Sequence, residues 1–228
     1  AAARPNILYI MTDDHAAHAI SAYGSRINQT PNLDRIASGG MRFDHVYATN
    51  SICTPSRATI LTGMYSHNNG VPVFNALPDD KPVVSEMLQK AGYATALIGK
   101  WGLGDVGPAE TGLPGRQGFD YFFGYLSQHR AHNHFPEFLW RNDQQIALPN
   151  QLIPVGDYGG GYCPDGVLYA DDLFADEALK FIAHHQDRPF FLYWSPVIPH
   201  ANNERNRALK DGAHVPDYGP YAHEDWPP

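Results

Sequence analysis

Three short apolar runs in the chain have the length of a β-strand and contain no charged residue. They are residues 6–11, 94–98 and 190–194. A continuous apolar run of this length is typical of a strand that is buried on both faces of a parallel sheet. The sequence therefore predicts three buried parallel strands.

Segments in which apolar residues recur at helical spacing lie between these runs. Helices are predicted over residues 31–39, 55–62, 87–91 and 169–182. The first two follow a threonine and begin with a proline, a combination that is favoured at helix N-termini. The first three are followed by a glycine, which commonly ends a helix.

The alternation of strands and helices favours a doubly wound α/β fold, with a mostly parallel central sheet flanked by helices. Residues 104–166, which are rich in Gly, Pro, His and aromatic residues, are predicted to form long functional loops. Open sheets of this kind bind ligands at the carboxyl ends of their strands. Asp13-Asp14, Lys100 and His200 follow the three predicted strands, so we expect them at one edge of the sheet.

Composition narrows the class of protein. The 228 residues are 43% hydrophobic and 18% charged, which is typical of a globular protein. The net charge is −8, and the absence of a basic run argues against nucleic acid as a partner. No apolar stretch approaches the roughly 20 residues of a membrane span. The two cysteines, Cys53 and Cys163, are too few for a disulfide framework.

Two adjacent carboxylates, Asp13 and Asp14, follow the first apolar run. Neighbouring side chains of an extended strand point to opposite faces, but at a strand end both can turn towards one cation that prefers oxygen ligands. A solvated loop that begins with two aspartates explains the same residues. The pair alone leaves both interpretations open.

Cys53 lies directly before the predicted helix N-terminus at Pro55. The free N–H groups and the dipole at such a position favour an anion, either a thiolate or a bound oxyanion. Arg57 lies one helical turn further on and can direct its guanidinium to the same place. A structural cysteine beside a surface arginine gives the same pattern, so these two residues alone do not decide.

The longer string of residues around Cys53 decides between these two interpretations in favour of a chemical role. Cys53-Thr-Pro-Ser-Arg57, followed by Leu61-Thr-Gly63, resembles the sulfatase signature, Cys-x-Pro-Ser-Arg with a trailing Leu-Thr-Gly. Other blocks of the family follow in the expected order: Arg4-Pro-Asn-Ile-Leu8, Thr12-Asp-Asp14, Thr30-Pro-Asn-Leu-Asp34, Gly92-Tyr93, Gly99-Lys-Trp101, Gly118-Phe-Asp-Tyr-Phe122 and Pro199-His200. The chain is similar to type I, formylglycine-dependent sulfatases of the alkaline-phosphatase superfamily, and most of all to bacterial arylsulfatase-like enzymes.

The resemblance implies an alkaline-phosphatase-like fold and a specific chemistry. In this family the signature cysteine is oxidised to formylglycine by a formylglycine-generating enzyme, and the aldehyde hydrates to a geminal diol. One hydroxyl of residue 53 then attacks the sulfur of a sulfated glycan or a small sulfate ester and expels the alcohol. The second hydroxyl expels sulfate and restores the aldehyde. Cations must stabilise the sulfate oxygens, and an acid must protonate the leaving alkoxide.

The resemblance also assigns roles to the remaining candidates. Asp13, Asp14 and residue 53 are implied to bind a divalent cation, Ca2+ or alternatively Mg2+. Arg57 is implied to steady the diol and the metal-side carboxylates, and Lys100 and His200 to contact the sulfate oxygens. Outside this context Lys100 is an ordinary strand-end lysine and His200 an ordinary loop histidine.

The sequence departs from the family pattern beside the nucleophile. Many members carry Gly-Lys-Trp-His, whereas this chain has Gly99-Lys-Trp-Gly102. The group that assists breakdown of the sulfated intermediate is therefore in question. The nearby loop offers His129 or His132 as a replacement, although histidines in such loops are usually polar surface.

The second departure lies downstream. The family has a later Asp-Asn or Asp-His pair in the metal site and a second catalytic lysine, and no apolar strand after His200 offers them. We therefore expect residues 1–228 to be the N-terminal portion of the catalytic sulfatase domain, without the C-terminal subdomain. Such a piece is expected to be inactive or poorly active by itself.

Three other interpretations stay open. The chain can belong to a phosphonate or phosphate ester hydrolase of the same superfamily, or it can be a non-catalytic fragment that binds sulfated glycans. Cys53 can also act as a simple thiolate nucleophile, although no histidine is positioned by sequence as its base.

The small residues Ala1-Ala-Ala3 resemble the remnant of a signal-peptide cleavage site, which favours a periplasmic or secreted bacterial protein. Several aromatic residues suit either stacking on a sugar or aryl ring or packing in the core. They are Trp101, Tyr125, Phe135 and Trp140.

Overall fold

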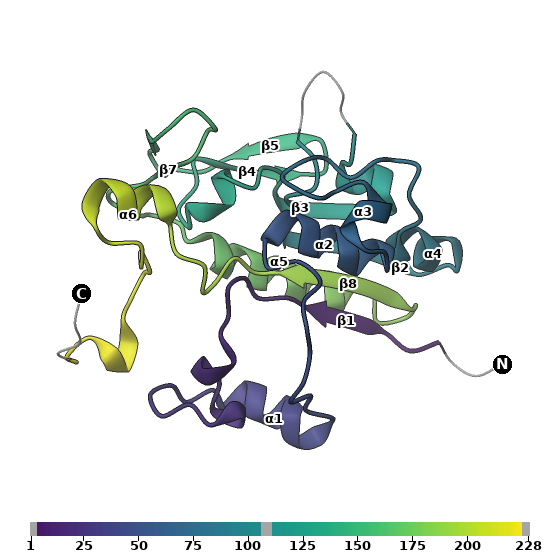
Figure 1. The fold of residues 1–228 in the computed structure, drawn as a ribbon, viewed down its shortest axis with the longest axis horizontal. Helices are drawn as coiled ribbons and strands as arrows, with labels where there is room; N and C mark the ends of the chain where they lie inside the picture. The colour runs from purple at the N-terminus through teal and green to yellow at the C-terminus, as the bar shows by residue number, and fades with distance from the viewer. Residues whose placement is uncertain (1–3, 106–110, 225–228) are drawn as a thin grey trace.

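A computed structural model describes residues 4–105 and 111–224, so the alanines at positions 1–3 lie outside the described residues. The fold is a six-stranded sheet with helices on both faces (Figure 1). The strands of this sheet, in spatial order, are β1 (Ile7–Ile10), β8 (Phe190–Ser195), β2 (Ala94–Lys100), β3 (Tyr121–Tyr125), β4 (Phe138–Arg141) and β5 (Gln144–Ala147). A two-stranded ribbon pairs β6 (Ile153–Pro154) with β7 (Gly161–Tyr162).

Within residues 4–105 and 111–224, six α-helices accompany the strands. They are α1 (Pro31–Gly39), α2 (Cys53–Thr62), α3 (Ser66–Asn69), α4 (Val84–Lys90), α5 (Ala170–His184) and α6 (Asn203–Leu209). In the part of the chain that is described, no helix has both the length and the apolar character needed to cross a bilayer.

The predicted fold class is confirmed. The neighbouring strands β1, β8, β2 and β3 all pair in parallel, and β4 and β5 extend the sheet as an antiparallel hairpin. The three predicted strands are present, but the prediction of loops throughout residues 104–166 is wrong. This range contains β3 to β7, and β3 escaped notice because Gly124 interrupts its apolar run.

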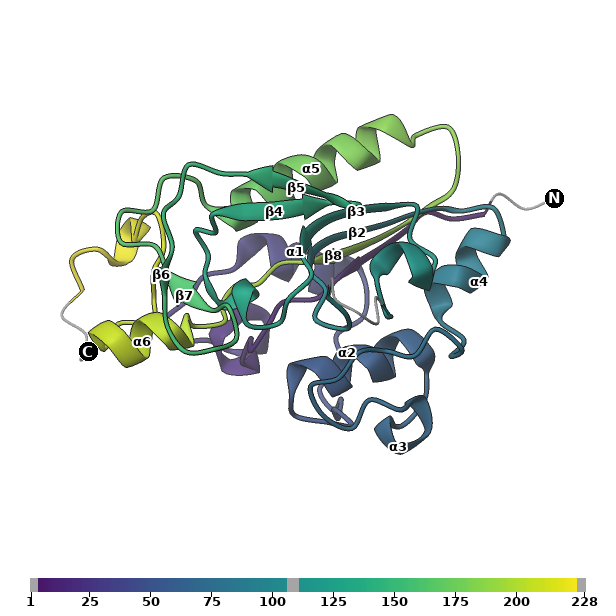
Figure 2. The same ribbon diagram turned by 90° about the horizontal axis from the view of Figure 1, so that it is seen from above.

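Two hydrophobic clusters hold helices to opposite faces of the sheet. On one face, Ala96 and Ile98 of β2 share a cluster with Phe174 of α5. On the other face, Leu97 of β2 shares a cluster with Ala58 of α2. All seven residues of β2 are buried, as expected for a central parallel strand covered on both faces. Figure 2 shows α5 on one side of the sheet and α2 and α4 on the other.

The segment that carries α1 extends away from this body (Figure 1). The helix begins at Pro31 as predicted, but none of its residues is buried, and Ile36 on its apolar face is 64% exposed. Strand β1 lies at the edge of the sheet, where Leu8 and Ile10 are 47% and 43% exposed.

Two glycines allow three strands to come together closely beside the site. Gly99 of β2 lies opposite Ser195 of β8 and Gly124 of β3. A Cβ atom on Gly99 would overlap the Ser195 carbonyl, and one on Gly124 would overlap the Gly99 carbonyl. Their φ angles of +112° and +155° also disfavour any side chain. The strand ends that carry the site therefore require glycine at both positions.

We predict that Gly99→Ala or Gly124→Ala lowers the free energy of unfolding by about 2–5 kcal/mol, because each adds backbone strain and steric overlap. Gly115→Ala is the matched control, since nothing lies within 4 Å of the added Cβ. It should change stability by less than about 1 kcal/mol. Urea denaturation measures all three, and equal effects would contradict the close approach of the strands.

Candidate active site

A single carboxylate, that of Asp13, joins three elements at the carboxyl edge of the sheet. Its Oδ2 atom accepts a hydrogen bond from Lys100 Nζ at 2.6 Å and one from Arg57 Nη2 at 3.3 Å. All three side chains are buried, with side-chain exposures of 6% for Asp13, 0% for Lys100 and 1% for Arg57. The predicted convergence of Asp13 and Lys100 at one edge is therefore confirmed.

Arg57 ties this group to the neighbouring strands. Its Nη1 atom donates to the Lys100 carbonyl at 2.7 Å and to Ser195 Oγ at 2.6 Å. Ser195, at the end of β8, is a contact that the sequence did not indicate. Arg57 therefore fixes helix α2 against the ends of β2 and β8, in agreement with the prediction that it points into the site.

Burial and charge act in opposite directions on the ionisable groups. Burial raises the pKa of Asp13, but the charges of Lys100 and Arg57 outweigh it, and the pKa of this carboxyl lies below its usual range. Burial and the Arg57 charge lower the pKa of Lys100, although Asp13 partly offsets them. Asp13 is therefore held ionised between two cations.

Cys53 is the first residue of α2, and Ile52 is the N-cap. The prediction that Thr54 is the cap is wrong by two residues. The Ser56 N–H already donates to the Ile52 carbonyl, and the Thr54 hydroxyl contacts the Gly102 carbonyl at 3.0 Å instead of capping the helix. The position still leaves Cys53 at the positive end of the helix dipole.

Cys53 meets Asp13 and His200 in one cluster, in which one ligand atom of each lies within 4.8 Å of the others. Burial raises the pKa of the Cys53 thiol, but hydrogen bonding to His200 and the charge of Lys100 outweigh it, so the pKa is lowered. Burial lowers the pKa of His200, yet its interactions with Cys53 and Asp13 leave the pKa raised. Both shifts favour a negatively charged group at position 53.

Asp14 lies apart from this cluster. Its backbone is in the left-handed region, with φ of +53°, and its side chain is 71% exposed. Its Oδ2 atom is 3.4 Å from His200 Nε2. The two adjacent carboxylates therefore differ in environment, and a metal-binding role for Asp14 stays a prediction.

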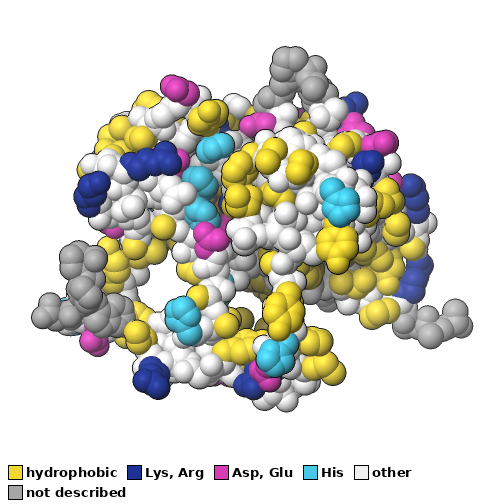
Figure 3. All heavy atoms as spheres, in the orientation of Figure 1, with side chains coloured by type: hydrophobic (Ala, Val, Ile, Leu, Met, Phe, Trp, Pro, Cys, Tyr) yellow, Lys and Arg dark blue, Asp and Glu magenta, His cyan; other side chains and the backbone are white. Residues whose placement is uncertain are grey.

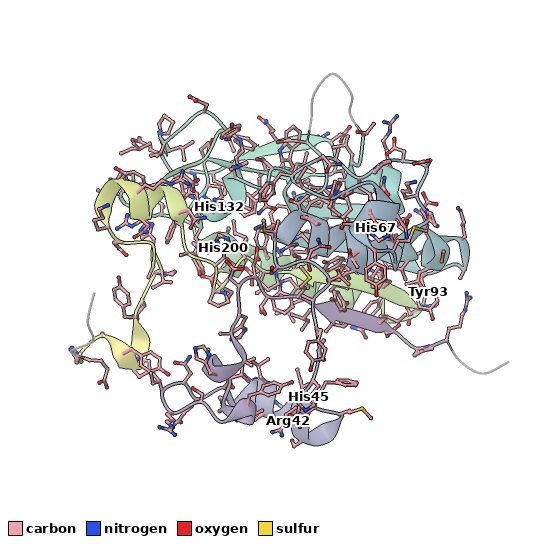
Figure 4. All side chains as sticks on the ribbon, in the orientation of Figure 1. Arg42, His45, His67, Tyr93, His132 and His200 are labelled. Atoms are coloured by element: carbon pink, nitrogen blue, oxygen red, sulfur yellow. The ribbon has the colours of Figure 1, made fainter. Side chains whose placement is uncertain are left out.

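A second histidine lies behind His200. The rings of His132 and His200 stack with centroids 4.7 Å apart, and His132 Nδ1 is 3.0 Å from the buried carboxylate of Glu204 in α6. Figure 4 shows the two histidines side by side, and Figure 3 shows histidines gathered on this face. Burial lowers the pKa of His132, although Glu204 partly opposes the shift. His132, held by Glu204, therefore packs against the His200 ring and helps to fix its orientation.

Gln128, in the loop after β3, contacts Cys53. This contact was not predicted from the sequence. Gln128 Nε2 donates to Cys53 Sγ at 3.0 Å, whereas the expected substitutes His129 and His132 make no such contact among the described interactions. His129 instead stacks on the exposed Tyr158 with ring centroids 5.0 Å apart. An uncharged amide has no sequence signature that could have indicated this role.

Three of the four aromatic residues considered for substrate stacking belong to the core. Trp101, Tyr125 and Phe135 are 1–3% exposed, and the Trp101 indole donates to the Gly112 carbonyl at 2.7 Å. Trp140 packs partly buried against the hydrophobic cluster that contains Leu97 and Ala58.

The donor set fits a divalent cation in part. Ca2+ takes about six to eight oxygen ligands. Among the clustered residues only Asp13 supplies a carboxylate, and its Oδ2 atom already faces Lys100 and Arg57. Residue 53 would add oxygen once it is oxidised and hydrated. A Ca2+ or Mg2+ site therefore stays a prediction that needs more ligands than this cluster contains.

The site combines Cys53 at a helix N-terminus, the buried side chains of Lys100 and Arg57, and His200 at the carboxyl edge of a parallel sheet. Such an arrangement at the carboxyl edge of an α/β sheet suits a bound anion. The sulfatase family model matches residues 5–225, and the chain belongs to the sulfatase family.

Curated relatives support this membership. The N-acetylglucosamine-6-O-sulfatase of Bacteroides thetaiotaomicron is 36% identical over 204 residues, which cover 87% of this chain and 31% of the relative. The human N-acetylgalactosamine-6-sulfatase is 32% identical over 218 residues, covering 86% of this chain and 40% of the relative. Bovine arylsulfatase A is 33% identical over 233 residues, covering 88% and 42%. The chain thus spans less than half the length of these relatives.

Solved structures share the fold. One, determined with its substrate D-glucosamine-2-N,6-O-disulfate, is 36% identical, has a TM-score of 0.69 and covers 86% of this chain and 35% of its own. Another, determined with a neocarrahexaose, is 26% identical, has a TM-score of 0.71 and covers 86% of this chain and 46% of its own.

We predict that Asp13→Asn lowers the free energy of unfolding by about 3–5 kcal/mol, because it leaves two buried cations without their shared carboxylate. Asp14→Asn is the matched control, since its side chain is 71% exposed. It should change stability by about 0.5 kcal/mol at most. Urea denaturation without divalent cations compares them, and a small effect of Asp13→Asn would refute its structural role.

Proposed function

We propose that the protein hydrolyses sulfate monoesters of carbohydrates or aryl alcohols, with residue 53 as the nucleophile after oxidation to formylglycine. The observation that carries this proposal is the cluster around Asp13. It places two buried cations beside residue 53, where the pKa of the unoxidised thiol is lowered. A sulfate ester brings one negative charge, and its oxygens gain charge in the transition state, so fixed cations stabilise it.

The side chains of the site have separate roles in the proposed hydrolysis. Lys100 and His200 contact the sulfate oxygens and balance their charge, while Arg57 steadies Asp13 and the diol of residue 53. The His200 Nδ1 atom lies 2.7 Å from the Ala201 carbonyl, which leaves Nε2 to face the site. His200 Nε2 would hold a proton there for the leaving alkoxide, as general acid catalysis requires.

A divalent cation would be held by Asp13, Asp14 and residue 53, together with ligands from elsewhere in the protein. When bound, it would supply Lewis-acid stabilisation of the sulfate oxygens. Ca2+ fits carboxylate donors best, and Mg2+ is the alternative.

The relatives suggest the substrate class. Several act by name on sulfated amino sugars, and one related structure contains glucosamine disulfate. A cavity of about 220 Å³ beside the nucleophile is lined by Phe74, Gln128 and His129, among other residues. Phe74 and Tyr158 flank His129 and are 55% and 75% exposed, so they offer ring faces to a sugar or aryl group. A sulfated glycan is therefore the favoured substrate.

Maturation requires a formylglycine-generating enzyme as a partner, which oxidises Cys53. A periplasmic or secreted location suits a protein that acts on a glycan substrate. Residues 1–228 would be the N-terminal portion of the catalytic domain. The exposed edge strand β1 and the exposed apolar face of α1 support this proposal, since a completing portion could cover both.

We predict that intact mass spectrometry of the full-length protein, made with a formylglycine-generating enzyme, shows a loss of about 18 Da at Cys53, because the CH2–SH side chain becomes the aldehyde CH=O and the sulfur leaves. Cys53→Ala should lower kcat/KM for 4-nitrophenyl sulfate by about 10⁴-fold or more. Cys163→Ala is the matched control and should keep the activity, because this second free cysteine is buried elsewhere. An active protein with an unconverted thiol at position 53 would sink the proposal.

We predict that residues 1–228 alone hydrolyse 4-nitrophenyl sulfate at least about 10²-fold more slowly than the full-length protein. The reason is that the cluster around Asp13 lacks part of the about six to eight oxygen ligands that Ca2+ needs. Both proteins are assayed with Ca2+, with Mg2+ and with chelator. Equal, metal-dependent rates would show that the missing ligands are unnecessary.

A further inference from the structure

Gln128 is a buried amide that reaches the nucleophile from the end of a neighbouring strand. The pairing of β2 with β3 continues past both strands, because Trp101 N and Gly102 N donate to the carbonyls of Tyr125 and Leu126 at 2.9 and 3.1 Å. Gln128 follows two residues after this ladder, and it is 9% exposed. Its position is therefore set by the sheet.

The side chain of Gln128 fills the space beside Gly102. A Cβ atom at position 102 would lie 2.5 Å from Gln128 Oε1 and 3.9 Å from Arg57 Cδ. The φ angle of Gly102 is +73°, which favours glycine. Glycine at 102 and glutamine at 128 therefore form a matched pair, in which the amide occupies the volume that a side chain at 102 would need.

Two contacts orient the amide. Gln128 Oε1 lies 3.3 Å from the Thr54 hydroxyl, which shares its one proton between this oxygen and the Gly102 carbonyl at 3.0 Å. Gln128 Nε2 donates to Cys53 Sγ at 3.0 Å. The sulfur stands where an oxygen of the hydrated residue 53 would lie after oxidation. A donor buried at this point would thus face the reacting hydroxyl directly.

We propose that Gln128 is a catalytic residue that stabilises the oxygen of residue 53 during release of sulfate. This inference rests on the proposed function. In the release step, the free hydroxyl of residue 53 loses its proton and its oxygen forms the aldehyde C=O bond. The C–O bond to sulfate breaks, and sulfate leaves with the electron pair. The Nε2–H group donates to the oxygen while negative charge develops on it, as donors in oxyanion holes do.

The released proton goes to water. The carboxamide is not a base near neutral pH, so Gln128 cannot accept the proton itself. A cavity of about 220 Å³ lies next to Thr54, Gly102 and Gln128, so water held there would be the acceptor. His132 does not serve here, because it is stacked on His200 and held by Glu204.

The test uses three variants of the full-length, formylglycine-containing protein with 4-nitrophenyl sulfate as the probe. Gln128→Ala removes the side chain, Gln128→Met keeps its bulk without the donor, and Gln128→Glu replaces the donor with a carboxylate. Each should lower kcat by about 10²-fold, the usual cost of losing one such donor. Gln151→Ala, at an exposed loop position, is the matched control and should keep the wild-type kcat.

The second readout is the covalent intermediate. Because the affected step follows attack on sulfur, the variants should accumulate protein that carries one added SO3 group, visible by intact mass during turnover. A kcat within twofold of wild type in Gln128→Met, or a loss of kcat without this adduct, overturns the inference. Activity retained by Gln128→Glu would indicate a general base and overturns it as well.

The outcome separates this inference from the proposed function. An inactive wild-type protein with a confirmed formylglycine would refute both. An active wild type with fully active Gln128 variants would refute only the role of Gln128.

Discussion

The buried carboxylate of Asp13 is the interaction on which the site depends. It accepts from Lys100 at the end of β2 and from Arg57 in α2, while Asp13 itself follows β1. Two buried cations without this partner would be costly in a low-dielectric interior, and one carboxylate shared between them makes their burial tolerable. The same contacts fix helix α2, and with it Cys53, against the edge of the sheet.

The arrangement also explains why the site suits an anion. Two cations facing one carboxylate leave an excess of positive charge around Cys53, and the helix N-terminus adds to it. Hydrogen bonding to His200, together with the charge of Lys100, lowers the pKa of the residue 53 thiol. The positive charge would equally stabilise a bound sulfate. Structure and electrostatics thus suit a negatively charged ester, and membership of the sulfatase family supports the proposal that this ester is a sulfate.

Much of this arrangement could be predicted from sequence, because the carboxyl ends of parallel strands lie at the same edge of a sheet. Asp13, Lys100 and His200 each follow an apolar run, so their meeting required only the sheet. Other features depended on tertiary contacts. Strand β3 was not predicted because Gly124 interrupts its apolar run. Without this strand, nothing in the sequence placed Gln128 beside Cys53. Thr54 looked like a helix cap, but its hydroxyl serves the Gly102 carbonyl. Trp101 and Tyr125 looked suited to a substrate, yet their burial and polar partners place them in the core.

The central claim is that the cluster around Asp13 and residue 53 was built for sulfate esters. The most direct measurement compares kcat/KM of the full-length, formylglycine-containing protein for 4-nitrophenyl sulfate, 4-nitrophenyl phosphate and 4-nitrophenyl phenylphosphonate under one set of conditions. These esters share a leaving group, so they differ only in the group transferred. We expect the sulfate to be preferred by about 10²-fold or more, a difference of about 2.7 kcal/mol in transition-state binding. Preference for the phosphate or the phosphonate would contradict the account.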